Sequence, residues 1–419
     1  MKKIILITMS LMVQQLSAQT IINYTTADGL VSDFVECIDV DDNDNVWIGT
    51  SVGVQMFDGS NWINYNTTSY PAMASDNIKV ISAMDNGDIW IGTDFGASIF
   101  DGSSWVTYTS DTMTTGSHMA IISNQVKSID EEIGSFGASV WIGTNLGVTP
   151  LDLSGATNSL SIGSPDLHWS GVNATAFDSN GDKWFASPLA GITHFDGTTF
   201  TPYDTSNGLL SQYVTALLID DQDNKWVGTS SGMSVLDASN TSFTQHTRMY
   251  IMPPPDTLNP VVDIAMDSYG RIWVAIYVGY LAEGGVAMWN GNQWIDFDVS
   301  DGLVGPNVRG LSIDSEDNVW IATSTGVSKI SAIPTAINTI SHTNTLIYPN
   351  PTSTYFKVVS SEDKFKNISV YNNLGSLVYA EGFNSKDEIQ LNFSAFSKGL
   401  YHLILSSDNG IENHKILIE

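Results

Sequence analysis

A tryptophan-centred motif recurs along this chain, and this repetition limits the possible folds more than any other feature. The seven copies read NVWIGT, DIWIGT, SVWIGT, DKWFAS, NKWVGT, RIWVAI and NVWIAT, around Trp47, Trp90, Trp141, Trp184, Trp226, Trp273 and Trp320. Short apolar runs flank each copy, and turns rich in Asp, Asn and Gly separate these runs. Four short strands in roughly 45 residues, with no helix between them, are typical of a propeller blade. We therefore expect an all-β fold with a seven-bladed β-propeller over residues 19–330.

The two ends of the repeat array predict how the ring closes. The seventh copy stops after its third strand, GVSKI, whereas Ile21–Tyr24 near the start of the chain has the pattern of a fourth strand. The segment that follows it, TTADGLVSDFV, aligns with DTSNGLLSQYV and DVSDGLVGPNV, which connect later blades. We therefore expect Ile21–Tyr24 to be the outer strand of the blade that contains Trp320.

The repeated residues have structural interpretations. The tryptophan is large enough to fill the space between neighbouring blades. A Gly or Ala two residues later allows the next blade to approach closely. The turns rich in Asp, Asn and Gly provide the backbone geometry of tight hairpins.

The charge of the chain excludes several classes of partner. It has 16 Lys and Arg against 45 Asp and Glu, a net charge of −29. A nucleic-acid-binding protein needs a basic surface, so DNA and RNA are excluded as partners, and so is an anionic membrane. Cys37 is the single cysteine, so no intramolecular disulfide can form, and we interpret it as an unreactive core thiol.

Residues 1–18 have the pattern of a secretory signal peptide. Two lysines precede the apolar run Ile4–Val13, which is too short to span a membrane, and we place cleavage after Ala18. No later stretch has the length and apolarity of a membrane-spanning segment. We therefore expect an exported protein.

The last part of the chain differs from the repeats in pattern and charge. Residues 331–345 are a polar, Pro-containing linker, and residues 346–419 contain several short strand patterns that predict a small β-sandwich. This tail has a net charge of −2, so the acidity of the chain lies in the repeats.

The repeats resemble the two-component regulator propeller repeat, with its W-I-G-T core and an Asp-Gly turn after the following strand. Proteins of that family are usually sensor portions of membrane histidine kinases. No membrane span or kinase segment follows the repeats here, so the resemblance implies the propeller and a ligand-binding role but not kinase signalling.

The tail resembles the type A C-terminal sorting domain of the type IX secretion system of Bacteroidetes. The matching positions are Tyr348, Pro349, Asn350, Pro351, Gly375, Gly399, Tyr401 and Lys415. The resemblance implies passage through the periplasm, interaction of the tail with the secretion machinery, and release to the medium or attachment to the outer cell surface.

Candidate ligand-binding residues lie in the loops between blades and in the insertion of the sixth repeat. These segments vary while the repeat core does not, and recognition usually takes place on variable loops of a rigid scaffold. The candidates are Tyr70, His118, His168, Trp169, Tyr250, Tyr277 and Tyr280. The alternative is that these side chains only seal the blades.

The sequence favours a non-catalytic binding propeller with a glycan or peptide ligand. Sequence motifs for hydrolases, nucleotide binding or metal binding are absent, so we expect no cofactor, and calcium at an Asp-rich turn such as DDNDN is the alternative. The alternative function is a secreted propeller lyase or hydrolase that acts on glycans or small molecules. Streptogramin lyases have similar repeats, but the propeller repeats of this chain hold no E-x-H.

Overall fold

The structure is a computed structural model that describes residues 20–110, 121–134, 137–152, 162, 167, 171–250, 259–278, 284–331, 345–360, 364–372, 377–386, 388–394, 396–407 and 411–418. The predicted signal peptide lies outside these residues. Thr20–Ser331 form one compact unit, and the C-terminal strands belong to a second.

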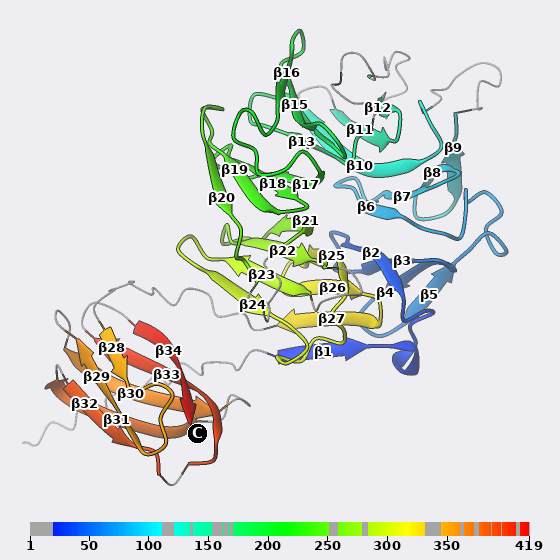
Figure 1. The fold of residues 1–419 in the computed structure, drawn as a ribbon. Helices are drawn as coiled ribbons and strands as arrows, with labels where there is room; N and C mark the ends of the chain where they lie inside the picture. The colour runs from blue at the N-terminus through cyan, green and yellow to red at the C-terminus, as the bar shows by residue number, and fades with distance from the viewer. Residues whose placement is uncertain are drawn as a thin grey trace, which may run out of the picture. The chain divides into compact units, whose positions relative to one another are not determined.

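Seven antiparallel sheets, one for each tryptophan motif, make up the described part of the first unit (Figure 1). The first strands of neighbouring sheets contact one another in a closed ring, so the later strands of each sheet lie progressively farther from the centre. This arrangement is the predicted seven-bladed propeller.

The first three blades contain strands β2 to β12. Their bounds are β2 (Val35–Val40), β3 (Val46–Thr50), β4 (Gly53–Phe57) and β5 (Trp62–Tyr65); β6 (Val80–Ala83), β7 (Ile89–Thr93), β8 (Gly96–Phe100) and β9 (Trp105–Tyr108); and β10 (Val126–Gly134), β11 (Gly137–Thr144) and β12 (Gly147–Asp152). The third blade has three described strands, and a single bridge between Val148 and Ile162 stands where the other blades have a fourth.

The remaining blades contain strands β13 to β27. Their bounds are β13 (Ala174–Phe177), β14 (Lys183–Ser187), β15 (Gly191–Phe195) and β16 (Phe200–Tyr203); β17 (Val214–Ile219), β18 (Lys225–Thr229), β19 (Gly232–Leu236) and β20 (Phe243–His246); β21 (Val261–Met266), β22 (Ile272–Ile276), β23 (Gly285–Trp289) and β24 (Trp294–Phe297); and β25 (Val308–Ile313), β26 (Val319–Thr323) and β27 (Gly326–Ser331).

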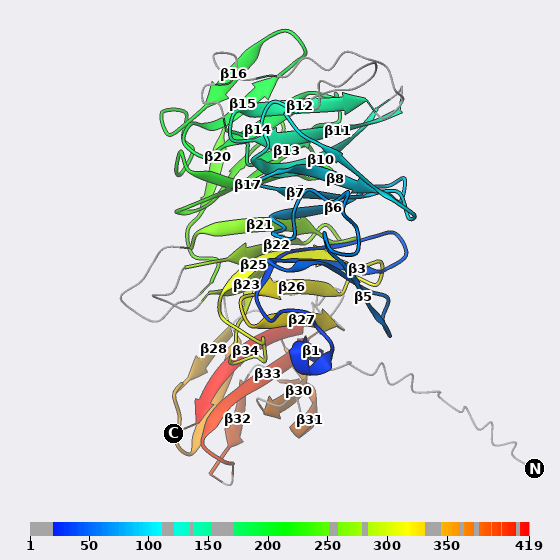
Figure 2. The same cartoon turned by 90° about the vertical axis from the view of Figure 1, so that its right-hand side faces the viewer.

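The seventh blade takes its outer strand from the start of the described chain. Strand β1 (Thr20–Tyr24) pairs antiparallel with β27, with Tyr24 opposite Val327, and a 3-10 helix, η1 (Thr26–Asp28), follows. The blue β1 lies beside the yellow β27 in both Figure 1 and Figure 2. This is the closure that the alignment of the DGL segments predicts.

The second strand of each blade is buried on both faces because another blade packs against it. Trp47 on β3 shares a core cluster with Ile78, Ile81 and Ile91 of the second blade. A Cβ atom at Gly49 would lie 2.3 Å from the Cys37 Sγ and 2.9 Å from the Ile78 Cγ2. The small residue after the tryptophan therefore allows the two blades to approach, as the sequence predicts.

The tryptophans are also anchored by hydrogen bonds to acidic turn residues. In five blades the indole Nε1 donates to a carboxylate six positions earlier, in the turn between the first two strands: the pairs are Trp47–Asp41, Trp184–Asp178, Trp226–Asp220, Trp273–Asp267 and Trp320–Asp314. Trp141 donates to Glu132 instead. The Trp90 Nε1 has no acceptor in the described structure, because Met84 occupies the position of the aspartate.

The second unit is a small β-sandwich of two sheets. One sheet has the order β28 (Thr345–Tyr348), β29 (Tyr355–Ser360), β32 (Glu388–Asn392); the other has the order β31 (Leu377–Lys386), β30 (Phe365–Asn372), β33 (Gly399–Ser407), β34 (Ile411–Ile418). A shared apolar core, which includes Phe356, Ile368 and Leu403, lies between them.

Candidate functional site

The two faces of the propeller hold different turns and connections, as the order of the strands dictates. Each first strand begins at one face, which also holds the connections between blades and the turns between second and third strands. The acidic turns between first and second strands lie at the other face. We call these the bulge face and the hairpin face.

A β-bulge marks the start of most innermost strands. The register with the second strand shifts at Glu36, Lys127, Thr215, Val262 and Arg309, each of which follows a buried valine. Lys79 and Asn173 follow the equivalent buried residues Ile78 and Val172 in the other two blades. Bulges redirect side chains and are frequent beside functional sites. We call these seven positions the bulge ring.

The bulge ring carries a charged network across three blades. The Arg309 Nε donates to the Glu36 Oε2 at 2.9 Å, and Nη2 of the same guanidinium contacts the same oxygen. The Lys79 Nζ lies 3.7 Å from the other oxygen, Glu36 Oε1. One carboxylate thus faces two cations, so this part of the ring keeps a net positive charge.

The polar side chains at the other ring positions differ in whether they form hydrogen bonds or ion pairs. The Asn173 side chain donates to the Val214 carbonyl oxygen of the next blade at 2.9 Å, and the Thr215 hydroxyl donates to the Val261 carbonyl oxygen. Lys127 is exposed, and no ion pair is found for it among the described residues. Lys127 is therefore the ring's most accessible charge.

Aromatic side chains accompany these charges at the bulge face. The Arg309 guanidinium lies 4.9 Å from the ring centre of Phe34 and 5.7 Å from that of Tyr277. Tyr213, which precedes the buried Val214, is 55% exposed. Aromatic side chains therefore lie beside the Arg309 cation of the bulge ring, and the Tyr213 ring is exposed at the same face.

Three of the ligand-binding candidates predicted from the sequence lie among the described residues, and four do not. Tyr70 is half-buried in a connection between blades, with its ring centre 5.3 Å from that of Tyr65. Tyr250 is buried, and its hydroxyl donates to Asp298 at 3.2 Å, so it packs within the fold. Tyr277 lies beside Arg309. The remaining candidates, His118, His168, Trp169 and Tyr280, lie outside the described residues.

Half-buried aspartates on the innermost strands connect neighbouring blades. Asp39, Asp130 and Asp263 accept hydrogen bonds from the backbone N–H groups of Ala83, Thr175 and Leu311 in the next blade. Burial raises the pKa of Asp130 and of Asp263 to about 7, and it also raises the pKa of Asp39. Their neutral forms are therefore favoured more than for ordinary carboxyl groups.

Cys37 has the properties of a structural thiol. Burial raises its pKa well above the usual range of cysteine, and the nearby carboxylates of Glu36 and Asp39 raise it further. Because the thiolate is the reactive form, this environment does not activate Cys37 as a nucleophile.

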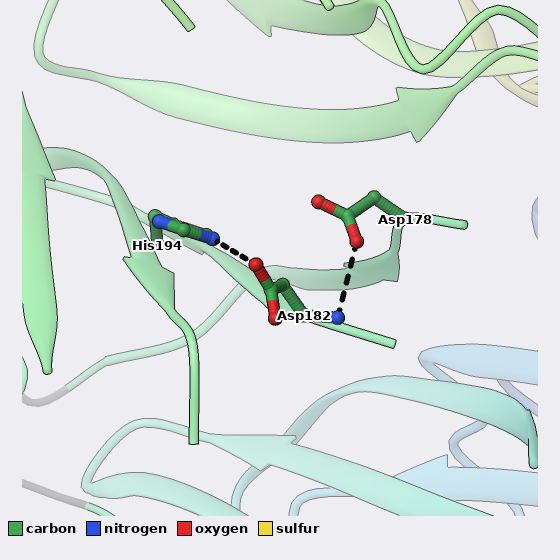
Figure 3. A group of neighbouring side chains, drawn as sticks. All are labelled: Asp178, Asp182 and His194. Carbon is green, nitrogen blue, oxygen red and sulfur yellow. Dashed lines mark hydrogen bonds and ion pairs between the residues drawn. The ribbon is translucent and has the colours of Figure 1, made fainter. Parts of the chain in front are cut away.

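Asp178, Asp182 and His194 form a possible metal-ligand cluster at the hairpin face (Figure 3). The His194 Nε2 lies 2.9 Å from the Asp182 Oδ2, and the Asp182 N–H donates to the Asp178 carboxylate. The second Asp178 oxygen accepts from the Trp184 indole, the same bond that aspartates make in four other blades. Hydrogen bonding of the repeat thus accounts for both Asp178 oxygens, and we assign the cluster a structural role.

The DDNDN turn, which the sequence offers as an alternative calcium site, is held by similar hydrogen bonds. Asp41 accepts from the backbone of Asn43 and Asn45 and from the Trp47 indole, and Asp44 accepts from Ser315 of the seventh blade. These bonds support the hairpin interpretation of the turn.

The sorting-signal positions are joined by contacts within the sandwich. The Asn350 side chain accepts from the Leu417 N–H at 2.9 Å, which links the YPNP segment to the last strand. Tyr401 is buried, and its hydroxyl donates to the Ser397 carbonyl oxygen. Gly399 has φ 150°, and Lys415 on β34 stands opposite His402. Gly375 lies outside the described residues.

The bulge ring is the feature that sequence reasoning missed. Its signal is present in the aligned repeats, because the position after the buried Val or Ile reads Glu, Lys, Lys, Asn, Thr, Val and Arg while the residue before it is always Val or Ile. The backbone bulge that makes this position distinctive becomes visible only in the strand register.

Residues 346–419 match the family model described as the secretion system C-terminal sorting domain. No curated protein is significantly similar to the chain in sequence. No helix among the described residues is long and apolar enough to cross a membrane.

Solved structures share the fold at low sequence identity. The extracellular domain of a putative hybrid two-component system from B. thetaiotaomicron is 15% identical, with a TM-score of 0.58 over 95% of this chain and 57% of that chain. PorZ, a surface component of the type IX secretion system of Porphyromonas gingivalis, is 15% identical, with a TM-score of 0.56 over 93% of this chain and 60% of that chain. This chain therefore spans less than two thirds of the length of either protein.

An enzyme is also among the structural neighbours. Virginiamycin B lyase from Staphylococcus aureus is 14% identical, with a TM-score of 0.57 over 75% of this chain and 99% of that chain. At these identities the similarity shows the fold alone. This chain therefore joins a seven-bladed β-propeller to a type IX secretion C-terminal sorting domain, and it is a secreted protein of the cell surface or extracellular space.

Proposed function

We propose that the propeller is a non-catalytic binding module whose glycan or peptide ligand contacts the bulge face. The observation that carries this proposal is the bulge ring itself. A repeated scaffold holds side chains of six different kinds at seven equivalent positions, and these include the exposed Lys127. Side chains that vary on a constant framework are typical of recognition surfaces.

The described groups at the bulge face make contacts that suit binding. Within the described part of the chain, no histidine lies on an innermost strand, and Glu36 is paired with Arg309 and Lys79. The deeper aspartates accept backbone hydrogen bonds that hold blades together. These contacts favour binding over the alternative of a propeller lyase.

The test is an array of glycans and peptides probed with the purified chain without its tail. Two equally exposed tyrosines provide matched variants: Tyr213 is 55% exposed at the bulge face, and Tyr269 is 56% exposed at the hairpin face. Tyr213→Ala should weaken the array signal, and Tyr269→Ala should leave it unchanged. Equal loss in both variants, or chemical conversion of the bound ligand detected by mass spectrometry, would contradict the proposal.

A further inference from the structure

We propose that the bulge ring recognises an acidic saccharide, whose carboxylate or sulfate group is held by Lys127 and Lys79 with Arg309. This inference rests on the proposed binding function and names the chemistry of the ligand.

The distribution of charge in the propeller is the first observation. Residues 20–345 contain 8 Lys and Arg against 37 Asp and Glu, yet three of these cations occupy the seven positions of the bulge ring. Only one ring position is acidic. A local positive site in an otherwise negative molecule is a site for an anionic group, because opposite charge attracts there and repels elsewhere.

The contacts of the three cations are the second observation. Lys127 is exposed with no ion pair among the described residues, and Lys79 is 3.7 Å from Glu36, longer than a strong charged hydrogen bond. Arg309 is oriented by Glu36 and by the faces of Phe34 and Tyr277. The ring therefore offers two lysines for direct contact and an arginine in a fixed orientation.

The aromatic side chains favour a saccharide over an acidic peptide. Tyr213 presents an exposed ring at this face, and Tyr277 lies beside Arg309. Aromatic faces stack on the apolar faces of sugar rings while adjacent cations pair with acidic substituents. The net charge of −29 opposes the approach of a long polyanion, which favours a short ligand with few charges.

The test measures the affinity of the purified chain for four probes of similar length. They are hexagalacturonate, a chondroitin sulfate hexasaccharide, neutral maltohexaose and a hexaglutamate peptide. We expect at least one acidic saccharide to bind about tenfold more tightly than maltohexaose. The preference should weaken as sodium chloride rises from about 50 to about 300 mM, because salt screens exposed charges.

Two sets of substitutions in the bulge ring, with opposite expected effects on the preference for the acidic saccharide, test whether the ring causes it. Lys79→Gln with Lys127→Gln should abolish the preference for the acidic saccharide, whereas Glu36→Gln should strengthen it because the competing carboxylate charge is removed. Lys183→Gln is the matched control, since Lys183 lies at the hairpin face in a 2.7 Å ion pair with Glu132. Thermal melting of each variant confirms folding.

Several results would overturn the inference. These are equal binding of maltohexaose, tighter binding of hexaglutamate than of either acidic saccharide, no binding of any probe, or an unchanged preference in the double lysine variant. If the glycan and peptide array still detects a ligand that depends on Tyr213, the proposed binding function stands while the acidic-saccharide inference fails.

Discussion

The Asp44 carboxylate accepts hydrogen bonds from the backbone N–H and the hydroxyl of Ser315, at 2.8 and 2.7 Å, although the two residues lie 271 positions apart. Asp44 has φ 59°, which places its side chain across the boundary between the first and seventh blades. Asp223 with Ser179, and Asp317 with Ser268, repeat this contact between other blades. The acidic hairpin turns thus join neighbouring blades as well as their own strands.

Removal of β1 should destabilise the ring at this same boundary. Strand β1 pairs along its whole length with β27, and the Tyr24 ring stacks on Trp320 with centres 5.6 Å apart. Deletion of residues 19–26 should lower the melting temperature by roughly 10 °C or more. The comparison variant is Asp44→Asn, which keeps a residue that tolerates positive φ and should cost only about 1 kcal/mol. A deletion variant that melts like the wild type would show that β1 does not close the ring.

The indole hydrogen bond can be isolated by comparing two buried tryptophans. Trp90 and Trp273 are both fully buried, and each stacks on an aromatic residue of the outer strand, Tyr108 or Phe297. Only Trp273 donates to a carboxylate, at 2.8 Å from Asp267. Trp273→Phe should therefore cost about 1–2 kcal/mol more than Trp90→Phe in denaturant unfolding. Equal costs would mean that the hydrogen bond contributes no net stability.

Asp263 should make the propeller less stable as pH rises. Burial, with a smaller contribution from Asp39, raises its pKa from the ordinary 3.8 to about 7. The folded state therefore holds the proton more tightly than the unfolded state does, and this stabilisation is complete below pH 4 and is lost as pH rises through 7. Relative to wild type, Asp263→Asn should gain roughly 1–3 kcal/mol between pH 5 and pH 8. A constant difference across this range would refute the raised pKa.

The tail should direct secretion and should not contribute to ligand binding. In a bacterium with a type IX secretion system, removal of residues 346–419 should leave the protein in the periplasm, because the tail carries the sorting domain. The purified truncated protein should bind its ligand as tightly as the full chain does. A truncated protein that still reaches the surface would contradict this assignment. A periplasmic reporter fused to residues 346–419 provides the reciprocal control and should be exported.

The blades could be predicted from sequence because their determinants are local and repeated. The tryptophan, the small residue after it and the acidic turn recur at nearly constant spacing, and each acts within its own hairpin or on the adjacent blade. The DGL connections could also be aligned, because Gly29, Gly208 and Gly302 share positive φ and each precedes a buried leucine. The sorting tail was recognisable from its ordered motifs.

The candidate site was less predictable because it depends on backbone register and on contacts between distant residues. The bulges that define Arg309 and Lys127 as ring positions do not follow from composition. The Arg309–Glu36 pair joins residues 273 positions apart. The sequence places Tyr250 in a loop, but its backbone N–H donates to the Asn259 side chain and its ring is buried.

Hydroxyl-radical footprinting of the unmodified protein can locate the ligand on one face of the propeller, because each face has an exposed tyrosine that serves as a control for the other. Tyr213 at the bulge face and Tyr269 at the hairpin face are equally exposed and should react at similar rates in the free protein. With the tightest-binding glycan or peptide from the array at saturation, we expect protection of Tyr213 and no change at Tyr269. Protection of Tyr269 with Tyr213 unchanged would place the ligand at the hairpin face and contradict binding at the bulge face.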